Sequence, residues 1–357
     1  MKPIPEKLIK KMLTERRPFS DPIAIIEDYI HSVESDQVED IPYFEMGCAK
    51  YDLGDSQGAL GDFNKVIEIN PQNAKAYNRR GVIKSESGDY QGAIVDFDFS
   101  LAIDQTLYKA YVNRGIARYT LADFQGALDD YEKAIAVNPN CLEAYINRGV
   151  AKSWQGDKTG AKDDYDFAST IDPDFPLIYF NRGFVEFEMH DYQKAIADYD
   201  KTLALNPEIM NAFFYRGASK LGIKDFRGAI ADFDISIAYD PTELEPYYNR
   251  AIAKLNIRDF KGAIMDNNKA LEIDPQFFGA YYYNGFAKYH SDSKDFQGAL
   301  IDFNKAIDIN PRFASAYFGR ANVELVFGDS ESAYWDLQKA KELGLIADFQ
   351  IIRQELN

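Results

Sequence analysis

The stretch AYVNRGIARYTLADFQGALDDYEKAIAVNP, from Ala110 to Pro139, is the clearest copy of a pattern that recurs through the chain. It follows again, slightly varied, as AYINRGVAKSWQGDKTGAKDDYDFASTIDP, from Ala144 to Pro173. The closing prolines lie 34 residues apart, at Pro139, Pro173, Pro207, Pro241 and Pro275. The same step backward reaches Gln105 and Pro71, and the last interval, to Pro311, is 36 residues. A period of 34 residues is typical of a helix–turn–helix solenoid, so we predict nine stacked copies.

Each copy contains two stretches with apolar residues at helical spacing, separated by a Gly-Asp or similar break. A small residue recurs in the first stretch, at Gly47, Gly81, Gly115, Gly149, Gly183, Gly217, Ala251, Gly285 and Ala321. An alanine recurs in the second, at Ala59, Ala93, Ala127, Ala161, Ala195, Ala229, Ala263, Ala299 and Ala333. Glycine inside a helix costs about 1 kcal/mol relative to alanine. We therefore expect each glycine to permit close contact with the facing alanine of the second helix.

This pattern resembles the tetratricopeptide repeat family. The matching features are an opening aromatic, the small residue four positions later, the alanine, an aromatic in the second helix and the closing proline. The opening aromatics are Tyr43, Tyr77, Tyr111, Tyr145, Tyr179, Phe213, Tyr247, Tyr281 and Tyr317. The resemblance covers about residues 40–347. It implies an all-α fold, a right-handed α-α superhelix of nine helix–turn–helix repeats with capping helices at both ends.

The resemblance assigns the repeats to residues 40–73, 74–107, 108–141, 142–175, 176–209, 210–243, 244–277, 278–313 and 314–347. Residues 1–39 are assigned to N-terminal capping helices; the alternative is a membrane or partner anchor built on its basic residues, Lys7, Lys10, Lys11, Arg16 and Arg17. Residues 345–357 are assigned to a C-terminal capping helix, with Ile346, Phe349 and Ile352 facing inward.

The chain departs from the family pattern in a regular way. Arginine replaces the leucine before the small residue at Arg80, Arg114, Arg148, Arg182, Arg216, Arg250 and Arg320. An aspartate recurs in the second helices, at Asp62, Asp96, Asp130, Asp164, Asp198, Asp232, Asp266, Asp302 and Asp336. A buried arginine needs a paired charge or several hydrogen bonds, so we predict an internal Arg–Asp ladder that stabilises the fold. The seventh copy also has Asn267 in place of the aromatic found at Phe233 and Phe303.

Composition limits the classes of function. The chain is 46% hydrophobic and 14% aromatic, which favours a continuous core over disorder. Its net charge of −17 argues against binding nucleic acid or anionic membranes, and no apolar run is long enough to span a bilayer. Cys48 and Cys141 lie almost three repeats apart and do not suggest a disulfide. With no Asn-x-Ser/Thr sequon, this predicts an intracellular, cytoplasmic setting.

The sequence gives no sign of a catalytic or metal site. His31, His190 and His290 are scattered, and no phosphate loop or nucleophile elbow occurs. Equivalent aspartates one repeat apart are a structural ladder, not a catalytic pair. We therefore expect a protein that is not an enzyme and that has no cofactor and no metal.

The resemblance implies that the first helices line a concave groove that holds a peptide. The residue two after the opening aromatic should point into it, at Asn113, Asn147, Asn181 and Asn249. An amide can both donate to and accept from a peptide backbone, and this series resembles the asparagine ladder of the repeat domain in O-GlcNAc transferases. The alternative is that neighbouring residues satisfy these amides. An aromatic set is expected on the same face, with part of it packed between first helices: Phe180, Phe184, Phe214, Tyr248, Tyr282 and Phe286.

We therefore predict a non-catalytic protein-interaction scaffold or adaptor that binds a peptide or helix of a partner protein in its concave groove. Two alternatives stay open. One is a structural assembly component that self-associates through the repeat surface as a homo-oligomer. The other is a regulatory subunit of an enzyme complex.

Overall fold

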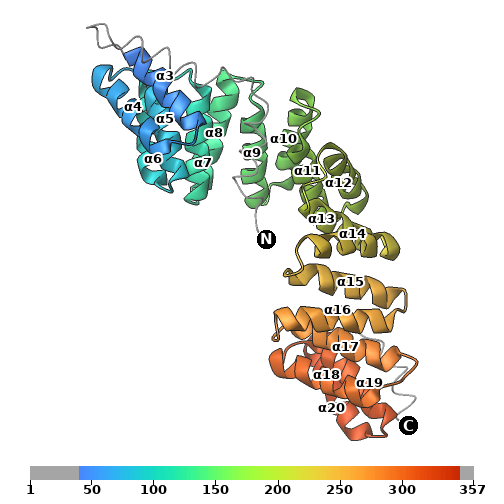
Figure 1. The fold of residues 1–357 in the computed structure, drawn as a ribbon. Helices are drawn as coiled ribbons and strands as arrows, with labels where there is room; N and C mark the ends of the chain where they lie inside the picture. Colours follow the sequence, from blue (N-terminus) through green and yellow to red (C-terminus); the bar gives the residue numbers. More distant parts are fainter. Residues whose placement is uncertain (1–39, 346–357) are drawn as a thin grey trace. The chain divides into compact units, whose positions relative to one another are not determined.

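The computed structural model describes residues 40–345, and every element of regular structure in this range is an α-helix (Figure 1). The helices form nine hairpins, each with a first and a second helix. The first helices are α3 (Asp40–Asp52), α5 (Ala74–Glu86), α7 (Tyr108–Thr120), α9 (Leu142–Trp154), α11 (Pro176–Glu188), α13 (Asn211–Gly222), α15 (Leu244–Asn256), α17 (Phe278–His290) and α19 (Ala314–Val326). The second helices are α4 (Ser56–Ile69), α6 (Tyr90–Ile103), α8 (Phe124–Val137), α10 (Lys158–Ile171), α12 (Tyr192–Leu205), α14 (Phe226–Tyr239), α16 (Phe260–Ile273), α18 (Phe296–Ile309) and α20 (Ser330–Glu342).

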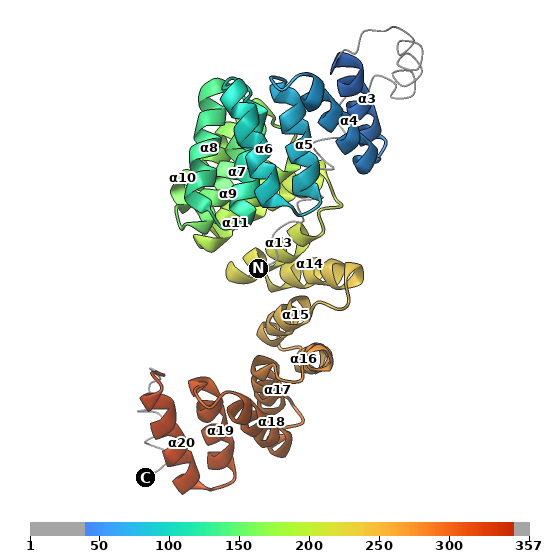
Figure 2. The same cartoon turned by 90° about the vertical axis from the view of Figure 1, so that its left-hand side faces the viewer.

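The prediction of an all-α fold made of tandem helix pairs is confirmed. The chain divides into two compact units, Met1–Val185 and Glu186–Asn357, with the boundary inside α11. Within each unit the hairpins follow one another in chain order (Figures 1 and 2). The capping helices expected in residues 1–39 and 345–357 lie outside the described residues, apart from Leu345. The assignment of residue ranges to individual repeats stays a prediction.

An aspartate cap starts most second helices. In α4, for example, the Asp55 carboxylate accepts a hydrogen bond from the backbone N–H of Gly58 at 2.8 Å. A Cβ atom on Gly58 would lie only 2.1 Å from that carboxylate, so the aspartate can cap the helix in this geometry only where the third residue after it is glycine. The same Asp-x-x-Gly pair caps α6, α8, α10, α14, α16 and α18.

The glycines of the first helices make room for an aromatic ring, not for the facing alanine as expected. A Cβ on Gly115 would lie 2.6 Å from the ring of Tyr131, and one on Gly217 would lie 2.9 Å from the ring of Phe233. Gly47, Gly81, Gly149 and Gly285 meet rings of their second helices in the same way. Where alanine replaces the glycine, at Ala251 and Ala321, the ring is replaced too, by Asn267 and Leu337. The small residue and the ring are therefore one packing unit.

The predicted Arg–Asp ladder is confirmed. In the third hairpin, Arg114 Nη2 lies 2.5 Å from Asp130 Oδ1, and its Nε donates to the other carboxylate oxygen at 3.0 Å. The same bidentate pair joins Arg80, Arg148, Arg216, Arg250 and Arg320 to the aspartate 16 residues later. Arg114 Nη1 also reaches Asp98 of the preceding second helix, at 2.5 Å. Arg80, Arg216, Arg250 and Arg320 reach the preceding second helix in the same way, so these arginines link consecutive hairpins as well as closing their own.

No helix within residues 40–345 is both long and apolar enough to cross a membrane. The two additional residues of the eighth copy lie in the turn between α17 and α18.

Candidate peptide-binding face

The four predicted asparagines occupy the same position in α7, α9, α11 and α15, and all four are half-buried. Two of them are satisfied internally. Asn113 Nδ2 donates to Asn78 Oδ1 at 3.0 Å, and Asn249 Nδ2 donates to the backbone carbonyl of Glu245 at 2.8 Å. Asn147 and Asn181 make no side-chain hydrogen bond within residues 40–345. The series therefore separates into two amides bonded within the chain and two amides whose side chains bond to no other described residue.

Asn147 and Asn181 lie in successive first helices of the first unit, beside buried apolar residues. Ile146 precedes one asparagine and is 3% exposed; Phe180 precedes the other and is 4% exposed. Both side chains therefore belong to the buried core of the chain. Phe180 was predicted as a ligand contact, but its burial removes its ring from the surface that a ligand can reach. Phe184, one turn along α11, is half-buried.

The remaining predicted rings belong to the second unit and pack mainly against one another and the hairpin cores. Phe214 lies against Phe233, with 5.9 Å between ring centroids. Tyr248 lies 4.8 Å from Phe277 by the same measure, and Tyr282 lies 5.1 Å from Phe313. All are half-buried, as is Phe286. Part of each ring surface is therefore taken up by packing against other rings of the second unit.

The tyrosines of this cluster stay neutral in the folded protein. Burial raises the pKa of Tyr248 above its ordinary value, as do the adjacent Tyr283 and Tyr282 phenols. Burial likewise raises the pKa of Tyr282 and Tyr283. A neutral phenol that is partly exposed can donate or accept one hydrogen bond, so this part of the face offers uncharged contacts.

Several large apolar side chains that are well exposed lie on second helices, where the sequence pattern gave no site. Met265 in α16, Ile301 in α18 and Trp335 in α20 are 62%, 60% and 64% exposed. The signal for them is present in the sequence, since each directly precedes the recurring aspartate. This signal did not predict a site, because the sequence of one repeat does not show whether exposed residues of neighbouring repeats form a common surface.

No group of histidine, cysteine, aspartate and glutamate side chains among residues 40–345 has the arrangement of a metal site. At least eight of the nine recurring aspartates pair with an arginine or lysine, as in Asp164, whose two oxygens face Arg148 and Lys152 at 2.6 and 2.9 Å. Their placement explains their recurrence through packing and pairing alone.

Tandem helix hairpins with a repeated ring, glycine and ion pair define an α-solenoid. Three tetratricopeptide repeat models match its sequence, at residues 42–73, at 63–95, and at 108–141 together with 176–209. The chain is a tetratricopeptide repeat protein. Repeats of this family support a role as a protein-interaction scaffold. None of the matching models describes an enzyme.

Solved structures share this fold. A tetratricopeptide repeat protein from Parabacteroides merdae is 21% identical, with a TM-score of 0.52, over 71% of this chain and 98% of its own. The pilF protein of Pseudomonas aeruginosa is 17% identical, with a TM-score of 0.54, over 58% of this chain and 94% of its own. YrrB, described as a TPR protein with an unusual peptide-binding site, is 23% identical over 52% of this chain and 95% of its own, with a TM-score of 0.48. A comparison with curated proteins finds no match.

Proposed function

We propose that the first-helix face captures a peptide segment of a partner protein, with Asn147 and Asn181 binding its backbone. The observation that carries this proposal is that two half-buried amides, in successive hairpins, have no side-chain hydrogen bond within the described part of the chain. A half-buried amide without a partner forgoes about 0.5–1.5 kcal/mol for each hydrogen bond that it could make. A peptide that lies across α9 and α11 can supply both missing partners.

Backbone recognition follows from the chemistry of the amide. Each asparagine offers a carbonyl oxygen to a peptide N–H and an amino group to a peptide carbonyl, whatever the peptide's side chains are. Each asparagine directly follows a buried residue, Ile146 or Phe180, in a regular helix, so the backbone loses little conformational freedom on binding. The partly exposed ring of Phe184 adds an apolar contact beside them, which gives some preference for apolar side chains.

The proposed role is that of a non-catalytic adaptor in the cytoplasm. Cys48 and Cys141 are the two cysteines of the chain, and both are free thiols. That fits a reducing compartment. The net charge of −17 fits a protein partner better than nucleic acid.

The test starts from peptides that the full chain selects out of a displayed random library. In the double variant Asn147→Ala/Asn181→Ala, loss of about 2 kcal/mol of hydrogen bonding should raise the Kd of these peptides about 30-fold. The matched control is Asn249→Ala, because Asn249 is bonded to its own helix. An unchanged Kd in the double variant, with the fold intact by circular dichroism, would reject the proposal. Sedimentation at two concentrations distinguishes it from self-association, which predicts an oligomer that added peptide does not change.

A further inference from the structure

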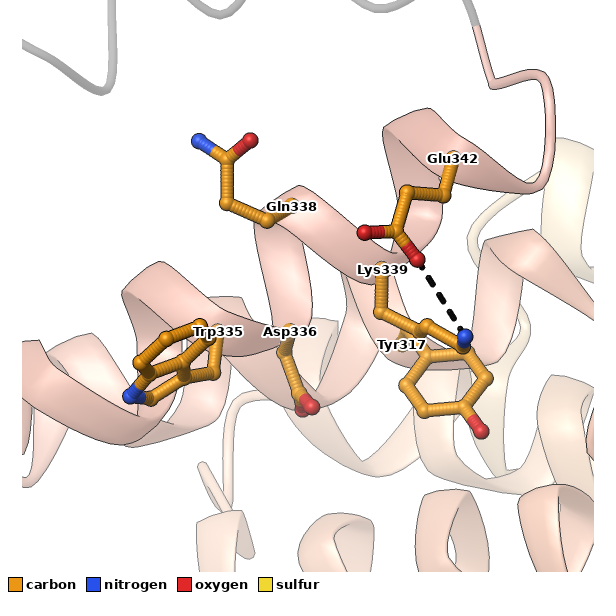
Figure 3. Close-up of a pocket in the computed structure, with 6 residues that line it drawn as sticks. All are labelled: Tyr317, Trp335, Asp336, Gln338, Lys339 and Glu342. Atoms are coloured by element: carbon orange, nitrogen blue, oxygen red, sulfur yellow. Dashed lines mark hydrogen bonds and ion pairs between the residues drawn. The ribbon is translucent and has the colours of Figure 1, made fainter.

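A shallow pocket recurs on the second helices of the last two described hairpins. One pocket, of about 460 Å³, is lined by Tyr317 of α19 and by Trp335, Asp336, Gln338, Lys339 and Glu342 of α20 (Figure 3). The other, also about 460 Å³, is lined by Tyr281 of α17 and by Ile301, Asp302, Asn304, Lys305 and Asp308 of α18. The six lining residues occupy identical repeat positions in the two hairpins. The pocket is therefore a feature of the repeat that occurs twice, and not an isolated depression of the surface.

An apolar wall continues through three hairpins of the second unit. Met265, Ile301 and Trp335 hold the same position in α16, α18 and α20 and are about equally exposed. The earlier hairpins have small or acidic residues there in all but one case: Gly61, Val95, Asp129, Asp163, Ala197 and Ala231. Figure 3 shows the Trp335 ring at one side of its pocket and the Tyr317 ring at the other, with Asp336 between them. Exposed apolar residues aligned in successive repeats indicate a contact surface.

The position three residues further on changes from acid to amide in the same hairpins. It is Asp98, Glu132, Asp166, Asp200 and Asp234 in the second to sixth hairpins, but Asn268, Asn304 and Gln338 in the last three. Asn304 Oδ1 accepts a hydrogen bond from Arg320 at 2.6 Å, which leaves its amino group available. Gln338 has no hydrogen-bond partner within residues 40–345. The surface thus carries uncharged donors and acceptors next to the apolar wall.

The charges of this surface are neutralised locally. In the pocket on α20, Lys339 lies 3.2 Å from Glu342, and Asp336 is held by Arg320 at 2.6 Å. In α16, Lys269 lies 2.6 Å from Glu272. In the pocket on α18, Lys288 neutralises Asp302, and Lys305 and Asp308 add one charge of each sign. This surface, in a chain of net charge −17, offers a partner no excess charge of either sign.

We propose that the outward surface of α16, α18 and α20 binds an uncharged amphipathic segment of a second partner protein, which places one apolar side chain in each successive pocket. This site is separate from the first-helix face and does not depend on it. Apolar contact with Ile301 and Trp335 supplies the affinity, and the amides of Asn304 and Gln338 bind the polar groups of the segment. Because local charges cancel, ionic strength should have little effect on binding. A polyanion or a basic peptide would need a net charge that the surface lacks.

The experiment uses the full chain and uncharged peptides from a displayed random library. Peptides retained by the wild type are tested against Ile301→Asp and Trp335→Asp, which place a charge in the apolar wall. We expect each change to weaken binding about tenfold or more for one class of peptides. The matched control is Val95→Asp, since Val95 has the same repeat position in the first unit and is 51% exposed. Asn147→Ala/Asn181→Ala should also leave this class unaffected.

A local readout comes from the two tryptophans of the chain, Trp154 and Trp335. In a Trp154→Phe background, binding of this class of peptides should shift Trp335 emission to shorter wavelength, at low and high salt alike. The proposal is overturned if every retained peptide binds Ile301→Asp as tightly as the wild type, or if high salt abolishes the binding. It is also overturned if Ile301→Asp converts a wild-type dimer to a monomer, because a second copy of the chain would then be the occupant.

Discussion

The seventh hairpin allows the ring–glycine packing unit to be rebuilt. There Ala251 and Asn267 stand where Gly217 and Phe233 stand one repeat earlier. Asn267 is 0% exposed, and neither its Oδ1 nor its Nδ2 has a hydrogen-bond partner in the described structure. An unsatisfied buried polar group costs about 1–3 kcal/mol. The double change Ala251→Gly/Asn267→Phe removes that cost and returns a ring to the core.

The two single changes should each behave differently from the pair. A Cβ at Gly217 would lie 2.9 Å from the Phe233 ring, so Asn267→Phe alone forces a ring against the Ala251 methyl group. Such overpacking costs about 1–3 kcal/mol. Ala251→Gly alone loses about 1 kcal/mol of helix propensity and leaves the amide unpaired. We therefore expect the double variant to be about 1–3 kcal/mol more stable than the wild type, with a favourable coupling of about 2 kcal/mol.

The assay is a double-mutant cycle by urea denaturation, with amide hydrogen exchange of α15 and α16 as the local measure, because repeat proteins do not always unfold in one step. Gly217→Ala, which adds a methyl group against an existing ring, is the control and should destabilise the sixth hairpin. Additive single effects, with a coupling below about 0.5 kcal/mol, would refute the reasoning.

Three further changes test other parts of the fold. Asp164→Ala should lower the free energy of unfolding by about 2–3 kcal/mol, because it leaves Arg148 beside an empty site, and the exposed Asp163→Ala should have almost no effect in the same denaturant titration. Burial beside a second carboxylate raises the pKa of Glu324 to about 7, so the folded state holds this proton more tightly than the unfolded state. The stability that protonated Glu324 contributes is therefore complete below its unfolded pKa near 4.5 and is lost as pH rises to about 7. Thermal melts of the wild type should show a loss of about 2 kcal/mol over this range, and Glu324→Gln should abolish that loss. An equal pH dependence of stability in the two proteins would contradict this prediction. Lys224 has a φ of +65°, so Lys224→Gly should stabilise the chain by about 0.5–1 kcal/mol in thermal unfolding, and a lower Tm would be the contrary result.

Periodicity in the sequence was sufficient to predict the helix pairs and the Arg–Asp ladder. The 16-residue spacing between Arg114 and Asp130 is identical in most hairpins, so a contact inferred once applies repeatedly. The packing partner predicted for the recurring glycines of the first helices was wrong. Spacing shows that Gly115 must be small, but only the three-dimensional arrangement shows that the ring of Tyr131, and not an alanine, lies against it.

The candidate site was less predictable than the fold. Four asparagines share one repeat position, yet Asn113 finds a partner in Asn78 and Asn147 finds none. That difference depends on side-chain orientation across hairpins, which a repeat pattern does not contain. The burial of the Phe180 side chain was not predicted, for a related reason. The same helix position is buried in one hairpin and half-buried in another, according to how closely the neighbouring hairpins pack.

The most direct test of partner capture is a crystal structure of the full chain with its tightest library-selected peptide. Our account predicts that the Asn147 and Asn181 side chains both lie within about 3.2 Å of peptide backbone atoms. A peptide bound elsewhere on the chain, with both asparagines without a contact to it, would contradict the account.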